Sequence, residues 1–144
     1  MGSVYYQVKK VGALLEQHLA IPSYQRPYKW QQKHVNQLID DVLTHRSKQC
    51  YRLGTVVLHR DALKPSYKGE LNIVDGQQRL LTLTLLCSLL DHSCEFSTPL
   101  LEHAFASRIS INNLEHNAKV IENRLVGLKD DERKSLLHLT LIHK

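Results

Sequence analysis

The residues with the clearest capacity for chemistry form the string Asp75-Gly76-Gln77-Gln78-Arg79. An apolar run that is typical of a strand precedes this string and an apolar run that is typical of a helix follows it, so we expect a strand-to-helix junction here. Such a junction exposes the first backbone N–H groups of the helix, which attract anions. Gly76 permits a tight turn, and the guanidinium of Arg79 can contact two phosphate oxygens at once.

The other side chains of the string widen the range of possible chemistry. Asp75 could hold a magnesium ion, orient Arg79 or act as a general base. Gln77 and Gln78 could position a sugar, a base or an attacking water. A structural role stays open, in which Asp75 caps the helix and Gly76 turns the chain. The phosphate-binding patterns GxxxxGK and GxGxxG are both absent from the chain.

A second candidate segment is Tyr24-Gln25-Arg26-Pro27-Tyr28-Lys29-Trp30, in which aromatic and basic residues alternate. Aromatic faces next to positive charges suit nucleic acid, because bases stack on the rings while the cations contact phosphates. The alternative is a connector whose aromatic rings pack over the edge of the core. Pro22 and Pro27 exclude a regular helix over this stretch.

The remaining pattern predicts the elements that position these residues. Two runs predict strands: Leu53–Leu58, which we expect to be buried, and Glu70–Val74, with a polar loop or hairpin over Arg60–Gly69 between them. The helix over Leu80–Leu90 is apolar on nearly all sides, so we expect it in the centre of the core. Apolar residues at helical spacing also predict helices over Val8–Leu19, Gln31–Arg46, Asn112–Leu125 and Asp130–Ile142, with a break at Cys94–Pro99.

Composition excludes several classes of protein. The chain has 144 residues, of which 42% are hydrophobic and 23% are charged, so it is neither disordered nor collagen-like. Its most apolar run falls well short of the roughly 20 residues that a membrane span needs. The three cysteines, Cys50, Cys87 and Cys94, and the nine histidines show no spacing typical of a disulfide framework or of a zinc site. We therefore expect reduced thiols in a cytoplasmic protein.

The charge and the ends of the chain add two expectations. The formal net charge of +5 permits contact with nucleic acid or with nucleotide phosphates. The N-terminal residues lack the apolar segment of a signal peptide. A helical pattern continues to the last residues, so we expect the chain to be part of a longer protein.

Three motifs, in this order, resemble a known family: Ile21–Trp30, Leu53–Leu58 and Ile73–Leu83. The family is the N-terminal domain of GmrSD-type modification-dependent restriction proteins, which is similar to ParB and sulfiredoxin domains. The resemblance covers residues 8–90. It implies an α+β fold, in which a small mixed sheet is packed with helices and is followed by a helical C-terminal segment. We accordingly expect a nucleotide-binding domain over residues 1–95 and a helical extension over 96–144.

In this family the DGQQR string is associated with binding and hydrolysis of nucleoside triphosphates in phage-defence systems. In those systems, nucleotide binding or hydrolysis controls a separate nuclease domain. The resemblance therefore implies a nucleotide-binding regulatory module. Carried over to this sequence, the catalytic residues would be Asp75, Gln77 and Gln78, with Asp75 as a magnesium ligand. The nucleotide would be bound by Gly76, Gln78, Arg79, Tyr24, Gln25 and Arg26. We expect Mg²⁺ and a nucleoside triphosphate, and no haem, flavin or zinc.

This sequence differs in two ways from the related families, and each difference argues against an activity. Gln78 precedes Arg79 where sulfiredoxins have Cys-His-Arg, so reduction of a sulfinic acid is not expected. Residues 100–144 contain no HNH-like pattern, so we expect any nuclease domain to lie outside this chain.

Two other functions remain open at this stage. One is a DNA-binding module without catalysis, in which Lys29 and Trp30 contact modified DNA. The other is a scaffold or interaction domain that uses the C-terminal leucines as an interface, namely Leu136, Leu137, Leu139 and Leu141.

Overall fold

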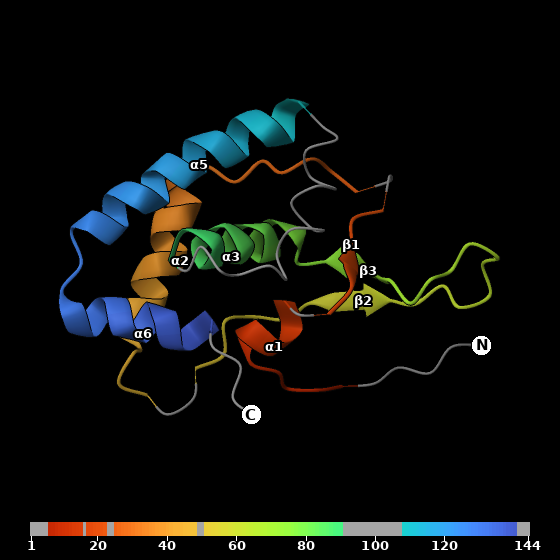
Figure 1. Ribbon diagram of the computed structural model, residues 1–144, viewed down its shortest axis with the longest axis horizontal. Coiled ribbons are helices and arrows are strands. Elements are labelled where there is room, and N and C mark those ends of the chain that lie inside the picture. Colours follow the sequence, from red (N-terminus) through yellow and green to blue (C-terminus); the bar gives the residue numbers. More distant parts are fainter. Residues whose placement is uncertain (1–5, 16, 23–24, 49–50, 91–107, 141–144) are drawn as a thin grey trace.

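The computed structural model describes residues 6–15, 17–22, 25–48, 51–90 and 108–140, with the side chains of 137–140 excepted. Figure 1 shows a small sheet at one end of the helix α3, the helices α2 and α6 toward the other end, and α5 running along one side of α3. The α+β expectation is therefore confirmed. The elements, in chain order, are α1 (Val11–Leu15), β1 (Leu19–Ala20), α2 (Gln32–Thr44), β2 (Val57–His59), β3 (Leu71–Asp75), α3 (Gln77–Leu90), α5 (Arg108–Val126) and α6 (Asp130–Thr140).

The sheet is mixed, as the family resemblance implies, and has the strand order β1-β3-β2. β1 is parallel to β3, with Leu19 opposite Leu71. β2 is antiparallel to β3, with Val57 opposite Asp75, and the pairing shifts register just after Val57. The central strand β3 contributes Ile73, which is fully buried, to the core. The polar loop or hairpin predicted over Arg60–Gly69 is the loop of a hairpin, because this segment joins the two antiparallel strands.

The helix α3 lies in the centre of the core, as its apolar sequence predicts. All of its residues from Leu80 to Cys87 are buried. Two buried threonine hydroxyls are satisfied within the helix, because Thr82 Oγ1 donates to the carbonyl of Gln78 (2.9 Å) and Thr84 Oγ1 to that of Leu80 (2.8 Å). These bonds let hydroxyl groups occupy the core without a large desolvation cost.

The outer helices pack on α3 with the faces that the sequence predicts. The predicted buried stripe of α2 is confirmed, and consists of Val35, Leu38, Ile39, Val42 and Leu43. α5 contacts both α2 and α3. Leu136 of α6 is fully buried in the same core, whereas the side chains of Leu137, Leu139 and Leu141 lie outside the described part. The proposed domain division at residue 95 also falls outside it.

Two sequence predictions about elements are wrong. The helix predicted over Val8–Leu19 ends at Leu15, and Leu19 instead enters β1. Leu19 fits the helical period, but its pairing with β3 buries it in the sheet. The predicted buried strand Leu53–Leu58 is reduced to Val57–His59 and is largely exposed. Gly54 has a φ of +146°, which interrupts an extended strand, and β2 lies at the edge of the sheet.

Within the described ranges, no helix has the length and apolar character that crossing a membrane requires. The break predicted at Cys94–Pro99 falls in residues 91–107 and lies outside those ranges.

Candidate functional site at the β3–α3 junction

The DGQQR string lies at a strand-to-helix junction, as its flanking pattern predicts. β3 ends at Asp75 and α3 begins at Gln77, so that Gly76 makes the turn. Gly76 has a φ of +99°, a backbone conformation that other residues adopt only at a cost. The first turn of α3 is closed by a bond from Leu80 N–H to the carbonyl of Gly76 (3.0 Å). The N–H groups of residues 77–79 precede that bond and point away from the helix at its N-terminus.

The segment that precedes β2 packs directly against this junction. A Cβ atom added to Gly76 would lie 3.0 Å from Cγ2 of Val56. A Cβ atom added to Gly54 would collide with Nη1 of Arg79 and would lie 3.0 Å from Cζ of the same guanidinium. The Arg79 guanidinium therefore rests against the backbone of Gly54, and only a residue without a side chain leaves it that space.

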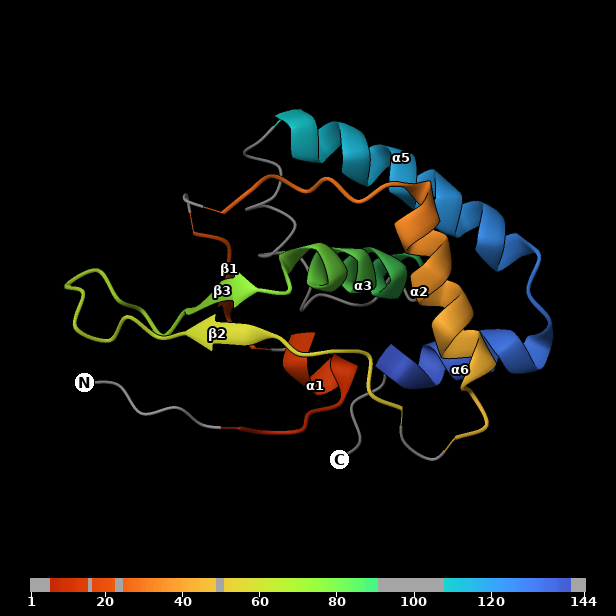
Figure 2. The same ribbon diagram turned by 180° about the vertical axis from the view of Figure 1, so that it is seen from behind.

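The connector between β1 and α2, residues 25–30, is the third segment at the junction. Figure 2 shows the connector running between α3 and α5. Gln25 Nε2 donates to the carbonyl of Val74 (3.0 Å), and Gln77 Nε2 donates to the carbonyl of Arg26 (2.8 Å). The three motifs of the sequence resemblance thus meet in space.

Gln78 fixes the connector with both ends of its amide. Its Oε1 accepts hydrogen bonds from the backbone N–H groups of Lys29 (2.7 Å) and Trp30 (3.1 Å). Its Nε2 donates to the carbonyl of Pro27 (3.3 Å). The connector belongs to no helix or strand, so these side-chain amides satisfy backbone groups that secondary structure would otherwise satisfy.

α5 holds the other side of the connector with the same kind of contact. Ser110 Oγ accepts the N–H of Tyr28 (2.8 Å), and Asn113 Nδ2 donates to the carbonyl of Tyr28 (2.9 Å). Asn117 Nδ2 donates to the carbonyl of Trp30 (2.8 Å). The connector is therefore bound by polar side chains of both α3 and α5.

The side chain of Tyr28 is fully buried and contacts both α3 and α5. Its hydroxyl is 2.8 Å from Thr82 Oγ1 and 2.8 Å from Asn117 Nδ2. The only hydroxyl proton of Thr82 is donated to the carbonyl of Gln78. The Tyr28 hydroxyl therefore donates to Thr82 and accepts from Asn117. Burial raises the pKa of the Tyr28 phenol, partly offset by its bonds to Thr82 and Asn117, so the phenol stays neutral.

Several polar groups at the junction have no partner among the described residues. Among the described residues, the side chains of Asp75 and Arg26 are exposed and make no hydrogen bond or ion pair. The Nε atom of Arg79 and the Oε1 atom of Gln77 are buried without a partner in the same part of the chain. A buried donor without a partner costs about 1–3 kcal/mol, more when it is charged, which favours an anion that would bind it.

The structure brings most of the predicted site residues together. Gly76, Gln77, Gln78 and Arg79 lie at the junction, and the connector brings Gln25 and Arg26 against it. Tyr24 lies outside the described residues. The two residues proposed for DNA, Lys29 and Trp30, differ: Lys29 is exposed, whereas Trp30 is half-buried and stacks on His34 (5.5 Å between ring centroids).

Sequence reasoning missed four residues that shape the site. Gly54 is part of a predicted strand, although a glycine inside a β-rich run is itself a signal of a bulge or a close approach. Ser110, Asn113 and Asn117 lie on α5, where polar residues read as a solvent-facing surface.

Another concave region is a pocket of about 320 Å³ lined by residues of α2, α6 and the loop after α2. Its Arg46 is already paired with Asp131 (3.5 Å) and bonded to the carbonyl of Leu43. Its Tyr51 ring stacks on His45 at 3.8 Å. Arg46 and the Tyr51 ring of this pocket therefore already have partners within the protein. The described ranges contain no cluster of three or more Asp, Glu, His or Cys residues that could hold a metal ion alone.

The fold and the junction together define an α+β domain with a glycine turn between a central strand and a buried helix. The chain belongs to the family described as the GmrSD restriction endonuclease, N-terminal domain, whose model matches residues 8–141. A comparison with curated proteins gives no match. The family match confirms the resemblance and extends it over α5 and α6. The domain is therefore part of a restriction protein.

Proposed function

We propose that this domain binds and hydrolyses a nucleoside triphosphate and so regulates the restriction protein to which it belongs. The observation that carries the proposal is the state of Arg79, whose buried Nε has no partner among the described residues although the guanidinium is held in place against Gly54. A fixed guanidinium with unused donors suits the non-bridging oxygens of a phosphate.

The neighbouring groups supply the remaining parts of a phosphate site. The N–H groups at the start of α3 face the same turn, and Arg26 adds an exposed second positive charge from the connector. Asp75 fits a magnesium ligand, because it is exposed and unpaired within the described residues. One carboxylate suffices, since Mg²⁺ is usually held by one or two carboxylates together with substrate phosphates and water.

The two glutamines have different parts in this proposal. Gln78 uses both ends of its amide on Pro27, Lys29 and Trp30, so it holds the connector in place. Gln77 uses only Nε2, which leaves Oε1 as a buried acceptor. An attacking water or a ribose hydroxyl could donate to that atom. Catalysis of phosphoryl transfer is mostly positioning and charge neutralisation, and these groups provide both.

The function is tested by calorimetric titration of GTP, ATP and CTP, with Mg²⁺ or with EDTA, into wild-type protein and Asp75→Asn. We expect Mg²⁺ to strengthen binding of one of these nucleotides to the wild type, because Asp75 and the phosphates share the ion. Asp75→Asn should lose that strengthening and should bind equally with and without Mg²⁺.

Asp130→Asn is the matched control for this titration, because Asp130 is an exposed aspartate at the start of a different helix, α6. This variant should bind as the wild type does. A folded wild type that binds none of the three nucleotides would contradict the proposal.

Gly54 gives a further prediction, because its lack of a side chain makes room for Arg79. Gly54→Ala should lower nucleotide affinity roughly tenfold, the equivalent of one lost charged hydrogen bond of about 1.5 kcal/mol. Gly69→Ala is the control, because Gly69 also has a positive φ (+91°) but an added Cβ would meet nothing within 4 Å. Both variants should lose stability, and equal nucleotide affinity in the two would mean that the position of Arg79 is unimportant.

A further inference from the structure

The segment from β2 to β3, residues 57–75, forms a hairpin that projects from the body of the domain (Figures 1 and 2). Its loop is folded by its own hydrogen bonds. Lys64 N–H donates to the carbonyl of Asp61 (3.1 Å), and Tyr67 N–H donates to the carbonyl of Lys64 (2.9 Å). Lys68 N–H donates to the carboxylate of Glu70 (2.8 Å). The projecting hairpin therefore has a defined shape at its tip.

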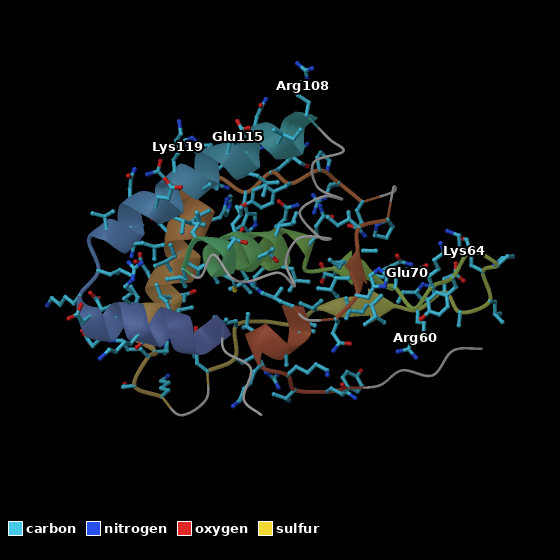
Figure 3. The ribbon with its side chains drawn as sticks, viewed as in Figure 1. Arg60, Lys64, Glu70, Arg108, Glu115 and Lys119 are labelled. Atoms are coloured by element: carbon cyan, nitrogen blue, oxygen red, sulfur yellow. The ribbon has the colours of Figure 1, made fainter. Side chains whose placement is uncertain are left out.

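The projecting hairpin carries three exposed basic side chains. Arg60, Lys64 and Lys68 are exposed, and none of them is in an ion pair within the described residues. In Figure 3, Lys64 lies above the hairpin and Arg60 lies below it. The projecting hairpin also carries the acidic residues Asp61, Glu70 and Asp75, of which Asp61 and Glu70 are half-buried and Asp75 lies at its base, next to α3. A hydrogen bond from the backbone N–H of Lys68 lowers the pKa of Glu70, so this carboxylate stays charged.

We propose that the projecting hairpin binds duplex DNA through the phosphates of both strands. The major groove is about 12 Å wide and admits a two-stranded β-ribbon. A ribbon in that groove has a phosphate backbone on each side, and the positions of Lys64 and Arg60 on opposite sides of the hairpin match this arrangement. DNA is the expected partner because the domain is part of a restriction protein. The proposal does not depend on nucleotide binding at the β3–α3 junction.

The experiment compares two charge-matched double variants of the 144-residue chain. Arg60→Ala with Lys64→Ala removes one arginine and one lysine from the projecting hairpin. Arg108→Ala with Lys119→Ala removes the same pair from the exposed surface of α5, at a distant part of the molecule (Figure 3). Binding of a fluorescein-labelled 20-base-pair duplex is measured by anisotropy over a series of salt concentrations.

The hairpin variant should lose two phosphate contacts, which lowers the slope of log affinity against log salt concentration by about 1.8 and the affinity at 0.1 M salt by roughly 60-fold. The α5 variant should keep both the slope and the affinity. Arg60→Lys with Lys64→Arg, which retains the charges, should restore the wild-type slope. Equal losses in the two alanine variants, or a folded wild type that does not bind the duplex, would overturn the proposal.

Discussion

Arg79→Ala should weaken binding of the nucleoside triphosphate by about 100-fold or more. The change removes two charge-assisted hydrogen bonds to phosphate, each worth about 1.5–3 kcal/mol, and every 1.4 kcal/mol is a factor of about ten in affinity. The guanidinium is already fixed against Gly54 with its Nε unpartnered within the described residues, so little order has to be created when the phosphate binds. Calorimetric titration with Mg²⁺ present measures the effect.

Two further variants separate geometry from charge in this prediction. Arg79→Lys keeps the positive charge but lacks the planar fork, so it should recover only part of the lost affinity. Arg26→Ala should have a smaller effect than Arg79→Ala, because the Arg26 side chain is exposed and its interaction is screened by water. Wild-type affinity in a folded Arg79→Ala variant would remove this residue from the site and, with it, the central support for nucleotide binding.

Tyr28→Ala should lower the free energy of unfolding by about 4 kcal/mol, a large part of the 5–15 kcal/mol that is usual for a domain. It empties a fully buried position between α3 and α5 and removes the hydroxyl that joins Asn117 to Thr82. Tyr28→Phe keeps the ring and loses only the hydroxyl, so it should cost about 1–2 kcal/mol. Urea denaturation, followed by circular dichroism, measures both values.

The control for this pair is Tyr67→Phe, because Tyr67 is half-buried in the loop of the projecting hairpin and its hydroxyl makes no hydrogen bond with the described residues. It should change stability by no more than about 0.5 kcal/mol. If Tyr28→Phe were as stable as the wild type, the chain of hydrogen bonds from Asn117 to Thr82 would contribute nothing to the fold.

The parts of the fold that the sequence predicts correctly are those with a strong local pattern. α2 repeats apolar residues at helical spacing, and α3 is apolar all round, so both patterns specify their elements and their burial. β1 has only two residues, Leu19 and Ala20, and exists because β3 pairs with it. No local pattern can indicate so short a strand, and Leu19 also fits the period of the preceding helix.

The candidate site was predictable in its residues but not in their contacts. The turn at Gly76 follows from the change of period on either side of it. The partners of Gln78, by contrast, are backbone groups 48 to 51 positions away in the chain. Residues such as Asn113 and Asn117 read as polar surface because their partner, the connector, is supplied only by the tertiary fold. Such dependence on distant segments is why the sequence left a structural role for the string open.

The binding of the connector by side chains has a consequence for hydrogen exchange with solvent. The amide protons of Tyr28, Lys29 and Trp30 are held by Ser110 of α5 and Gln78 of α3, although the connector itself has no regular secondary structure. These protons can exchange only after their bonds to these two side chains have opened. An irregular segment should therefore be protected from exchange, and the exchange rate of its amides reports on how often the connector is released by the side chains of α3 and α5.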